Sequence, residues 1–265
     1  MPRAAVNGIQ VYYEWHGSPG APVLVLNNGI LMNAAASWVR QTADFARHHR
    51  VLQYDCRGQG QSDHPDEPYS MEGHADDLAG LLDVLGVSRA HVAGISYGGE
   101  VAQAFALRHA DRVRSLVLAD TVSEVGAELR IVMRAWLAAA RSGDADAFFD
   151  VTVPWNFSPA FVASNGPLLA EARRRYRELD LPAVARLCEA FGGVDFTERI
   201  AGIAAPTCVI VAAEDILKGP AYARIIADRI AGAELHVIAG AGHAVCWERP
   251  AEFNTVVLGF LAKVP

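Results

Sequence analysis

Short apolar runs alternate with stretches of helical periodicity along most of the 265-residue chain. Runs such as 22–26 carry apolar side chains at successive positions, a pattern typical of parallel strands buried on both faces. The segment 9–15 instead alternates apolar and polar positions, which indicates an edge strand. The pattern predicts strands at 9–15, 22–26, 51–54, 90–93, 113–119, 207–212 and 234–238, and helices at 37–48, 70–86, 99–107, 221–230 and after residue 250.

This alternation is interrupted once. Between Thr121 and about Gly193 the sequence predicts only helices, punctuated by four prolines. Repeated strand–helix units imply a parallel, doubly wound sheet. We therefore expect an α/β fold whose core comprises residues 1–120 and 194–265, with a helical cap, residues 121–193, inserted between the two parts. The cap would cover the carboxyl edge of the sheet, where such folds bind their ligands.

Composition and charge narrow the class of protein. With 52% hydrophobic residues, the chain can form one complete α/β domain with an inserted subdomain. A formal net charge of −7 and a pI near 5.7 argue against nucleic acid or an anionic membrane as the main partner. No apolar stretch approaches the roughly 18 residues that span a membrane, and the N-terminal segment lacks the apolar stretch of a secretory signal.

The four cysteines are scattered, without a Cys-x-x-Cys motif, which favours reduced thiols in a cytoplasmic protein. Cys56 and Cys246 lie close in sequence to candidate site residues, but we expect both to be buried, inert thiols. We expect no metal site, because the chain has no His-Glu-x-x-His motif and its cysteines are too widely spaced. The sequence leaves the oligomeric state open between a monomer and a homodimer.

The segment Gly94–Gly98, Gly-Ile-Ser-Tyr-Gly, carries the strongest chemical signal. It follows an apolar strand pattern and precedes a helical pattern, so Ser96 is expected in a sharp strand-to-helix turn. Such a turn has a strained backbone and presents the serine hydroxyl alone at the sheet edge. The residues two positions away must be small, because the turn brings them close to the strand and the helix. These features predict that Ser96 is a nucleophile.

A serine hydroxyl needs a general base within hydrogen-bond reach, and the base needs an orienting carboxylate. On this topology the chain order is serine, acid, histidine. His243 is the predicted base, since it alone among the histidines follows the last strand and a Gly-rich loop. Asp215 follows the strand at 207–212 and is the predicted acid. Asp120, which follows the preceding strand, is its rival.

The tetrahedral intermediate of such a reaction needs two backbone N–H donors. One is expected from Tyr97, the residue after the nucleophile. The other is expected from the loop after the strand at 22–26, where Ile30 is our choice and Leu31 the alternative. Gly29 is expected to let this loop pass close to the substrate oxygen. Ile30 and Tyr97 are thus the predicted oxyanion hole.

These motifs resemble those of the α/β-hydrolase superfamily, and the resemblance covers nearly the whole chain. The segment Asp55–Ser62 is similar to the family's Asp-x-Arg-Gly-x-Gly-x-Ser loop. Gly242-His243, followed by Glu248 and Pro250, is similar to its catalytic-histidine segment. Asn28-Gly29 stands where many members carry His-Gly. The resemblance implies an α/β-hydrolase fold, with a mostly parallel, doubly wound sheet and a helical cap inserted after the sixth strand. The stretch 54–120 is most similar to the branch of 3-oxoadipate enol-lactonases, esterases and non-haem haloperoxidases.

A dinucleotide site is not expected from the glycines of the Asp55–Ser62 loop. Gly58 and Gly60 begin a Gly-x-Gly-x-x-Gly pattern, but Asp63 occupies the place of the third glycine. The predicted chemistry needs no metal or organic cofactor.

Together the residues predict a serine hydrolase that cleaves a carboxylic ester or lactone of a small, apolar substrate through an acyl-enzyme. Trp155 and Phe157, expected on a proline-broken loop of the aromatic-rich cap, are the predicted pocket residues. The side chain of Tyr97 is a further candidate to face the pocket. A C–C bond hydrolase or a thioesterase would use the same triad. A ligand receptor that keeps the fold and a slow triad is the alternative from another class.

Overall fold

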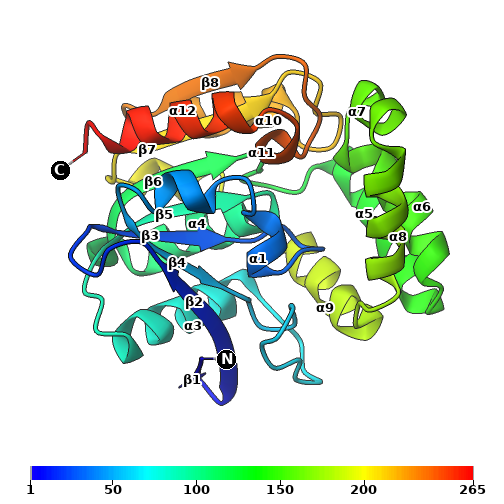
Figure 1. The fold of residues 1–265 in the computed structure, drawn as a ribbon, viewed down its shortest axis with the longest axis horizontal. Helices are drawn as coiled ribbons and strands as arrows, with labels where there is room; N and C mark the ends of the chain where they lie inside the picture. The colour runs from blue at the N-terminus through cyan, green and yellow to red at the C-terminus, as the bar shows by residue number, and fades with distance from the viewer. Residues whose placement is uncertain (1, 265) are drawn as a thin grey trace.

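An eight-stranded sheet forms the centre of the structure, a computed structural model that describes residues 2–264 (Figure 1). The spatial order of the strands is β1-β2-β4-β3-β5-β6-β7-β8. β2 pairs antiparallel with β1 and β4, and all other neighbours are parallel. The strands are β1 (Arg3–Val6), β2 (Ile9–His16), β3 (Val23–Asn27), β4 (Arg50–Tyr54), β5 (Ala90–Ile95), β6 (Val113–Ala119), β7 (Thr207–Ala212) and β8 (Glu234–Ile238).

The first strand, β1, was not expected from the apolar pattern. It forms a hairpin with β2 in which Val6 pairs with Ile9, so Asn7 and Gly8 are the two turn residues. Both have positive φ, 45° and 82°. A two-residue hairpin turn of type I′ requires that conformation at both positions and favours Asn-Gly. The Asn-Gly pair was therefore the sequence signal for β1.

Helices cover both faces of the sheet (Figure 1). On one face, α3 and α4 pack with α10 against an apolar cluster, and on the other, α12 and the short helices α1, α2 and α11 enclose a second cluster. Their bounds are α1 (Ala34–Ser37), α2 (Thr42–Phe45), α3 (Met71–Val84), α4 (Tyr97–Arg108), α10 (Pro220–Arg229), α11 (Val245–Glu248) and α12 (Pro250–Leu261), with short 3₁₀ turns at Ala110–Arg112 and Ile200–Gly202.

The expected helix at 37–48 is wrong, because two short helices, α1 and α2, occupy this region instead. Trp38 leaves the helical conformation (φ −116°, ψ 16°) and is fully buried, with its ring 6.3 Å from that of Phe253. The side-chain amide of Gln41 donates to the backbone oxygen of Cys246. Packing of these two side chains against the C-terminal part of the chain overrides the local periodicity.

Five helices lie between β6 and β7, beyond one end of the sheet (Figure 1). They are α5 (Ala127–Ser142), α6 (Ala145–Asn156), α7 (Pro159–Ser164), α8 (Gly166–Tyr176) and α9 (Leu181–Gly192). We refer to residues 121–193 as the cap, the segment proposed from the sequence. Side chains of α5 and α9 belong to the same apolar cluster as those of α3 and α4, so cap and core share one buried interior.

The two ends of the cap are bonded to each other. Val125 N donates to Val194 O at 3.1 Å, and Phe196 N donates to Ser123 O at 2.7 Å. These bonds flank an isolated antiparallel bridge between residues 124 and 195. The cap therefore leaves and rejoins the core at one point. No helix among residues 2–264 combines the length and apolar character needed to cross a bilayer.

Candidate active site

Ser96 lies in the sharp turn between β5 and α4. Its backbone has φ 53° and ψ −121°, a conformation that L-residues rarely adopt. A Cβ on Gly94 would lie 2.1 Å from the backbone oxygen of Gly98, and a Cβ on Gly98 would lie 2.2 Å from that of Asn27. Both distances are well below 3.0 Å, closer than the Cβ atom of a real side chain comes to a non-bonded atom. The glycines thus let β5, α4 and the end of β3 meet around Ser96.

The structure brings Ser96, His243 and Asp215 into one hydrogen-bonded row. His243 Nε2 lies 2.8 Å from Ser96 Oγ, and His243 Nδ1 lies 2.8 Å from Asp215 Oδ2. The three residues follow β5, β8 and β7, so all of them stand at the carboxyl edge of the sheet. All three are buried. In this arrangement the imidazole can take the serine proton while its other nitrogen faces a carboxylate.

The carboxylate of Asp215 is kept ionised by its neighbours. Burial raises the pKa of this carboxyl, but the facing His243 and two backbone donors outweigh that effect and hold the pKa below its usual value. The two donors are the N–H groups of Leu217 and Lys218, at 2.7 and 2.9 Å from Oδ1. One carboxylate oxygen is thereby fixed by the backbone, and the other is left to orient the imidazole.

Asp120, the rival acid, has a different place. It is fully buried with φ 42°, and its oxygens accept from the backbone N–H groups of Ala212 (2.8 Å) and Val245 (3.3 Å) rather than from the imidazole. Burial, together with the charge of Asp215, raises its pKa well above the usual value. Asp120 therefore ties the end of β7 to the segment after His243, and Asp215 is the carboxylate that contacts the base.

The loop after β3 lies against the turn that carries Ser96. The backbone oxygens of Asn27 and Asn28 would both contact a Cβ on Gly98, so the loop starts beside the serine. The side-chain amide of Gln59 donates to the backbone oxygens of Gly29 and Ile30, at 3.0 and 3.1 Å. These bonds fix the carbonyl groups of Gly29 and Ile30 against the side chain of Gln59.

The N–H groups of the predicted oxyanion donors lie on the loop after β3 and at the first residue of α4. Within residues 2–264, those of Ile30, Leu31 and Tyr97 have no hydrogen-bond acceptor in the protein. Ile30 stays the predicted oxyanion donor on this loop, with Leu31 as the alternative. A Cβ on Gly29 would meet no protein atom within 4 Å. If glycine is required at position 29, the requirement comes from a bound substrate and not from neighbouring protein atoms.

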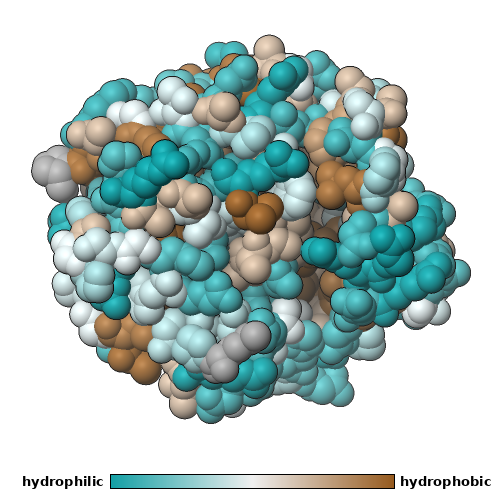
Figure 2. Space-filling view, in the orientation of Figure 1, coloured by the Kyte–Doolittle hydropathy of each residue, from teal (hydrophilic) through white to brown (hydrophobic). Residues whose placement is uncertain are grey.

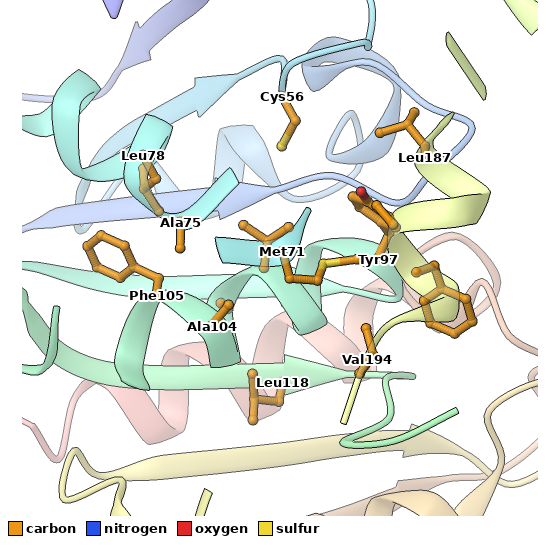
Figure 3. Packing of buried hydrophobic residues seen from close by; sticks show 14 of the residues in the cluster. Cys56, Met71, Ala75, Leu78, Tyr97, Ala104, Phe105, Leu118, Leu187 and Val194 are labelled. Atoms are coloured by element: carbon orange, nitrogen blue, oxygen red, sulfur yellow. The ribbon is translucent and has the colours of Figure 1, made fainter. Parts of the chain in front are cut away.

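The side chain of Tyr97 does not face a pocket, so that expectation is wrong. Its hydroxyl lies 2.7 Å from His74 Nε2, and its ring is buried among Cys56, Met71 and Leu187 (Figure 3). Burial and the nearby Arg57 lower the pKa of His74 to about 3, so this imidazole is neutral. The backbone N–H of Tyr97 stays a predicted oxyanion donor, while its side chain is part of the core.

The two cysteines considered in the sequence are both buried. Burial raises the pKa of the Cys56 thiol to about 12. It also raises the pKa of Cys246, to well above its usual range. Since the thiolate is the nucleophilic form, both side chains are unreactive thiols at neutral pH.

Trp155 and Phe157 lie at the end of α6 and not on a proline-broken loop. Trp155 is in the last turn of this helix, and Phe157 is its C-terminal cap residue. Pro154 lies inside the last turn of this helix and has no N–H to donate to the carbonyl group of Asp150. Both aromatic side chains are half-buried, and Phe157 stacks on Phe161 with ring centroids 4.8 Å apart.

These aromatic residues stand next to the histidine segment. The backbone oxygen of Asn156, between them, accepts from Ala244 N at 2.9 Å. Figure 2 shows a hollow between the α1 region and the cap helices, with apolar residues in it. The bond from Ala244 to Asn156 places the end of α6 beside His243, and the role of Trp155 and Phe157 as pocket residues stays a prediction. No group of three or more His, Cys, Asp or Glu side chains within residues 2–264 is arranged to hold a metal ion.

Three polar residues near the site were not singled out by the sequence as site residues. Lys218 and Glu100 form a buried ion pair, with Nζ 2.9 and 3.0 Å from the carboxylate oxygens. Glu248 accepts from Ser158 of the cap and from Gly242 beside His243. The resemblance had marked Glu248 only as part of a motif. No pattern in the sequence pointed to Lys218, because its partner Glu100 lies 118 positions away.

The amino-acid sequence matches the model of a known family. A family model described as the α/β hydrolase fold matches residues 22–250. The chain belongs to the α/β-hydrolase fold family. The match confirms the resemblance stated from the sequence, and it agrees with the observed mostly parallel sheet flanked by helices.

Relatives within the family are hydrolases of small molecules by name. The chain is 30% identical over 267 residues to a protein assigned as the carbamate hydrolase RutD in Azorhizobium caulinodans, covering 100% of this chain and 99% of that protein. It is 27% identical to 3-oxoadipate enol-lactonase 2 of Acinetobacter baylyi, covering 94% and 92%. The solved structure of the enol-lactonase from Burkholderia xenovorans LB400 superposes with a TM-score of 0.93 at 34% identity, over 98% of this chain and 100% of that one. These similarities support a hydrolase of the α/β fold.

Proposed function

We propose that this protein is a serine hydrolase that cleaves a carboxylic ester or lactone through an acyl-enzyme. The hydrogen-bonded row of Ser96, His243 and Asp215 carries the proposal. A nucleophile, a base and an orienting carboxylate in this order form the arrangement by which serine hydrolases activate a hydroxyl. Its position at the carboxyl edge of the sheet, under the cap, is where an α/β fold binds a substrate.

In the proposed reaction, Ser96 Oγ attacks the carbonyl carbon while His243 Nε2 takes the hydroxyl proton. Asp215 holds the imidazole in the tautomer with a proton on Nδ1 and stabilises the imidazolium that forms. The N–H groups of Ile30 and Tyr97 stabilise the oxyanion, with Leu31 the alternative for Ile30. His243 then protonates the leaving oxygen and activates water to hydrolyse the acyl-enzyme. Every proton is transferred by a residue of this chain, and the proposed steps use no cofactor.

A small, largely apolar molecule is the proposed substrate. Enol-lactonases among the relatives support a lactone or ester, and the half-buried Trp155 and Phe157 support an apolar acyl or ring group. We propose no nucleic-acid or membrane partner, in keeping with the net charge of −7. A cytoplasmic location fits the four cysteines, which are all buried and free.

The proposal is tested by hydrolysis of p-nitrophenyl acetate, butyrate and octanoate. The wild type should turn over at least one ester, and Ser96→Ala and His243→Ala should reduce kcat by about 10⁶-fold, to the background of the fold. Ser96→Ala with unchanged turnover would exclude the proposed nucleophile. A wild type inactive on all three esters would favour one of the three alternative functions. Hydrolysis of a meta-cleavage diketone would indicate the C–C hydrolase, and hydrolysis of an acyl thioester would indicate the thioesterase. Tight ligand binding without turnover would indicate the receptor.

A further inference from the structure

The end of α6 is bonded to the chain on both sides of His243. On the C-terminal side, Ala244 N donates to the backbone oxygen of Asn156 at 2.9 Å. On the N-terminal side, Gly242 N donates to Glu248 Oε1 at 3.0 Å, and the same oxygen accepts from Ser158 N at 3.0 Å. The Ser158 hydroxyl donates to the second oxygen of Glu248. One carboxylate therefore joins the cap to the histidine segment.

The two segments also touch without space between them. A Cβ on Gly242 would lie 2.5 Å from the backbone nitrogen of Ser158 and 2.8 Å from the carbonyl carbon of Phe157. Ser158 is buried, and its hydroxyl also accepts from Phe161 N to begin α7. Because the contact is backbone against backbone, a displacement of residues 156–158 must displace Gly242 as well.

The carboxylate of Glu248 is half-buried and accepts three hydrogen bonds from these donors. None of the ion pairs found within residues 2–264 includes Glu248. Its three acceptor contacts come from two N–H groups and one hydroxyl, all uncharged. A carboxylate that accepts several such bonds fixes the separation of its donors more firmly than a single neutral contact would.

We propose that Glu248 is a positioning residue that couples the pocket wall at Trp155 and Phe157 to the imidazole of His243. This inference rests on the proposed function, in which His243 is the base. An acyl group that presses on either aromatic ring acts on Asn156, which accepts from Ala244, or on Ser158, which shares the Glu248 carboxylate with Gly242. Substrate shape is thereby linked to the distance between the base and Ser96. Misplacement of a catalytic group by about 1 Å can cost about 10²-fold in rate.

The test compares Glu248→Gln and Glu248→Ala with the matched control Glu252→Gln, which removes an exposed carboxylate on α12. Glutamine keeps the size of glutamate but replaces one acceptor oxygen with an NH₂ donor. In the Glu248 variants, kcat for p-nitrophenyl esters should fall by about 10- to 100-fold with a smaller change in KM. The ratio of the rates on octanoate and acetate should also change. The control should retain the wild-type values.

A role in folding alone would give a different result. It would lower the activity on every ester by one factor, equal to the loss of folded protein, and would leave the octanoate-to-acetate ratio unchanged. That outcome, or wild-type kinetics in Glu248→Ala, would overturn the proposal.

Hydrogen exchange provides a readout that does not depend on activity. In Glu248→Ala, the amides of Gly242 and Ser158 should both exchange faster than in the wild type, while Glu252→Gln leaves them protected. Faster exchange in only one of the two segments would contradict the coupling. If the wild type hydrolyses no ester, the proposed function falls, but the exchange rates still decide whether Glu248 joins the cap to the histidine segment.

Discussion

Two buried aspartates lie near His243, and their surroundings shift their pKa values in opposite directions. Asp215 has a lowered pKa and contacts the imidazole, whereas Asp120 has a raised pKa and contacts only backbone donors. We expect Asp215→Asn to reduce kcat for p-nitrophenyl esters by about 10⁴-fold, because the imidazole loses the carboxylate that orients and stabilises it. Asp120→Asn is the matched control and should cost far less. A larger loss in Asp120→Asn than in Asp215→Asn would reverse the assignment.

The same aspartate should make stability depend on pH. The pKa of Asp215 is lower in the folded protein than the usual value of 3.8, so its ionised form stabilises the fold. This contribution is complete above about pH 5 and is lost as the pH falls through the folded value. Chemical denaturation at several pH values should therefore show that wild type and Asp215→Asn differ most near neutral pH and converge toward about pH 2. A difference that grows with acidity would contradict the lowered pKa.

At the scale of elements, the turn between β5 and α4 has no space for side chains other than those of Ser96 and Tyr97. Gly98→Ala should lower the free energy of unfolding by about 2 kcal/mol or more, because its Cβ would lie 2.2 Å from Asn27 O. Gly259→Ala is the control, since a Cβ there meets no atom within 4 Å in α12. That change should be neutral or stabilising by up to about 1 kcal/mol. Equal stabilities of the two variants in denaturant titrations would be inconsistent with the observed packing.

The buried ion pair joins three elements at the base of the cap. Lys218 follows Asp215, its partner Glu100 is on α4, and its ammonium lies 4.2 Å from the ring centroid of Phe191 on α9. Lys218→Met should cost about 3–5 kcal/mol of unfolding free energy, because it leaves Glu100 buried without a counter-charge. The double variant Lys218→Met/Glu100→Gln should regain much of that loss, and an equally unstable double variant would show that the charge is not the cause.

At the scale of the whole molecule, the cap supplies the proposed pocket and the core supplies the triad. Trp155→Ala and Phe157→Ala should therefore change the relative kcat/KM for p-nitrophenyl octanoate and acetate by about 10-fold or more, and acetate should be affected least. Val162→Ala, at an exposed position on α7, is the control. Equal effects of the aromatic substitutions on both esters would remove these residues from the pocket.

The features that could be predicted from the sequence are those that depend on the order of strands and helices along the chain. Ser96, Asp215 and His243 could be predicted because each follows an apolar strand in a parallel sheet, so all three reach one edge. The structure shows them in contact, and their catalytic roles stay a prediction. β1 was missed although Asn7-Gly8 indicated its turn.

Other features could not be predicted, because they depend on contacts between distant segments. The direction of the Tyr97 side chain follows from the turn that points it at His74. The bonds from Glu248 to Ser158 join residues 90 positions apart, with no pattern in either segment to indicate the partner. Such pairs are set by how the cap packs on the core.

The most direct test of the central claim is to identify the acylated residue. The protein is mixed with p-nitrophenyl butyrate, quenched in acid within the first turnovers, digested and analysed by mass spectrometry. The account predicts a butyryl group on Ser96, formed together with a burst of p-nitrophenol and absent from Ser96→Ala. A butyryl group on another residue, or turnover without any acylated Ser96 in the wild type, would contradict it.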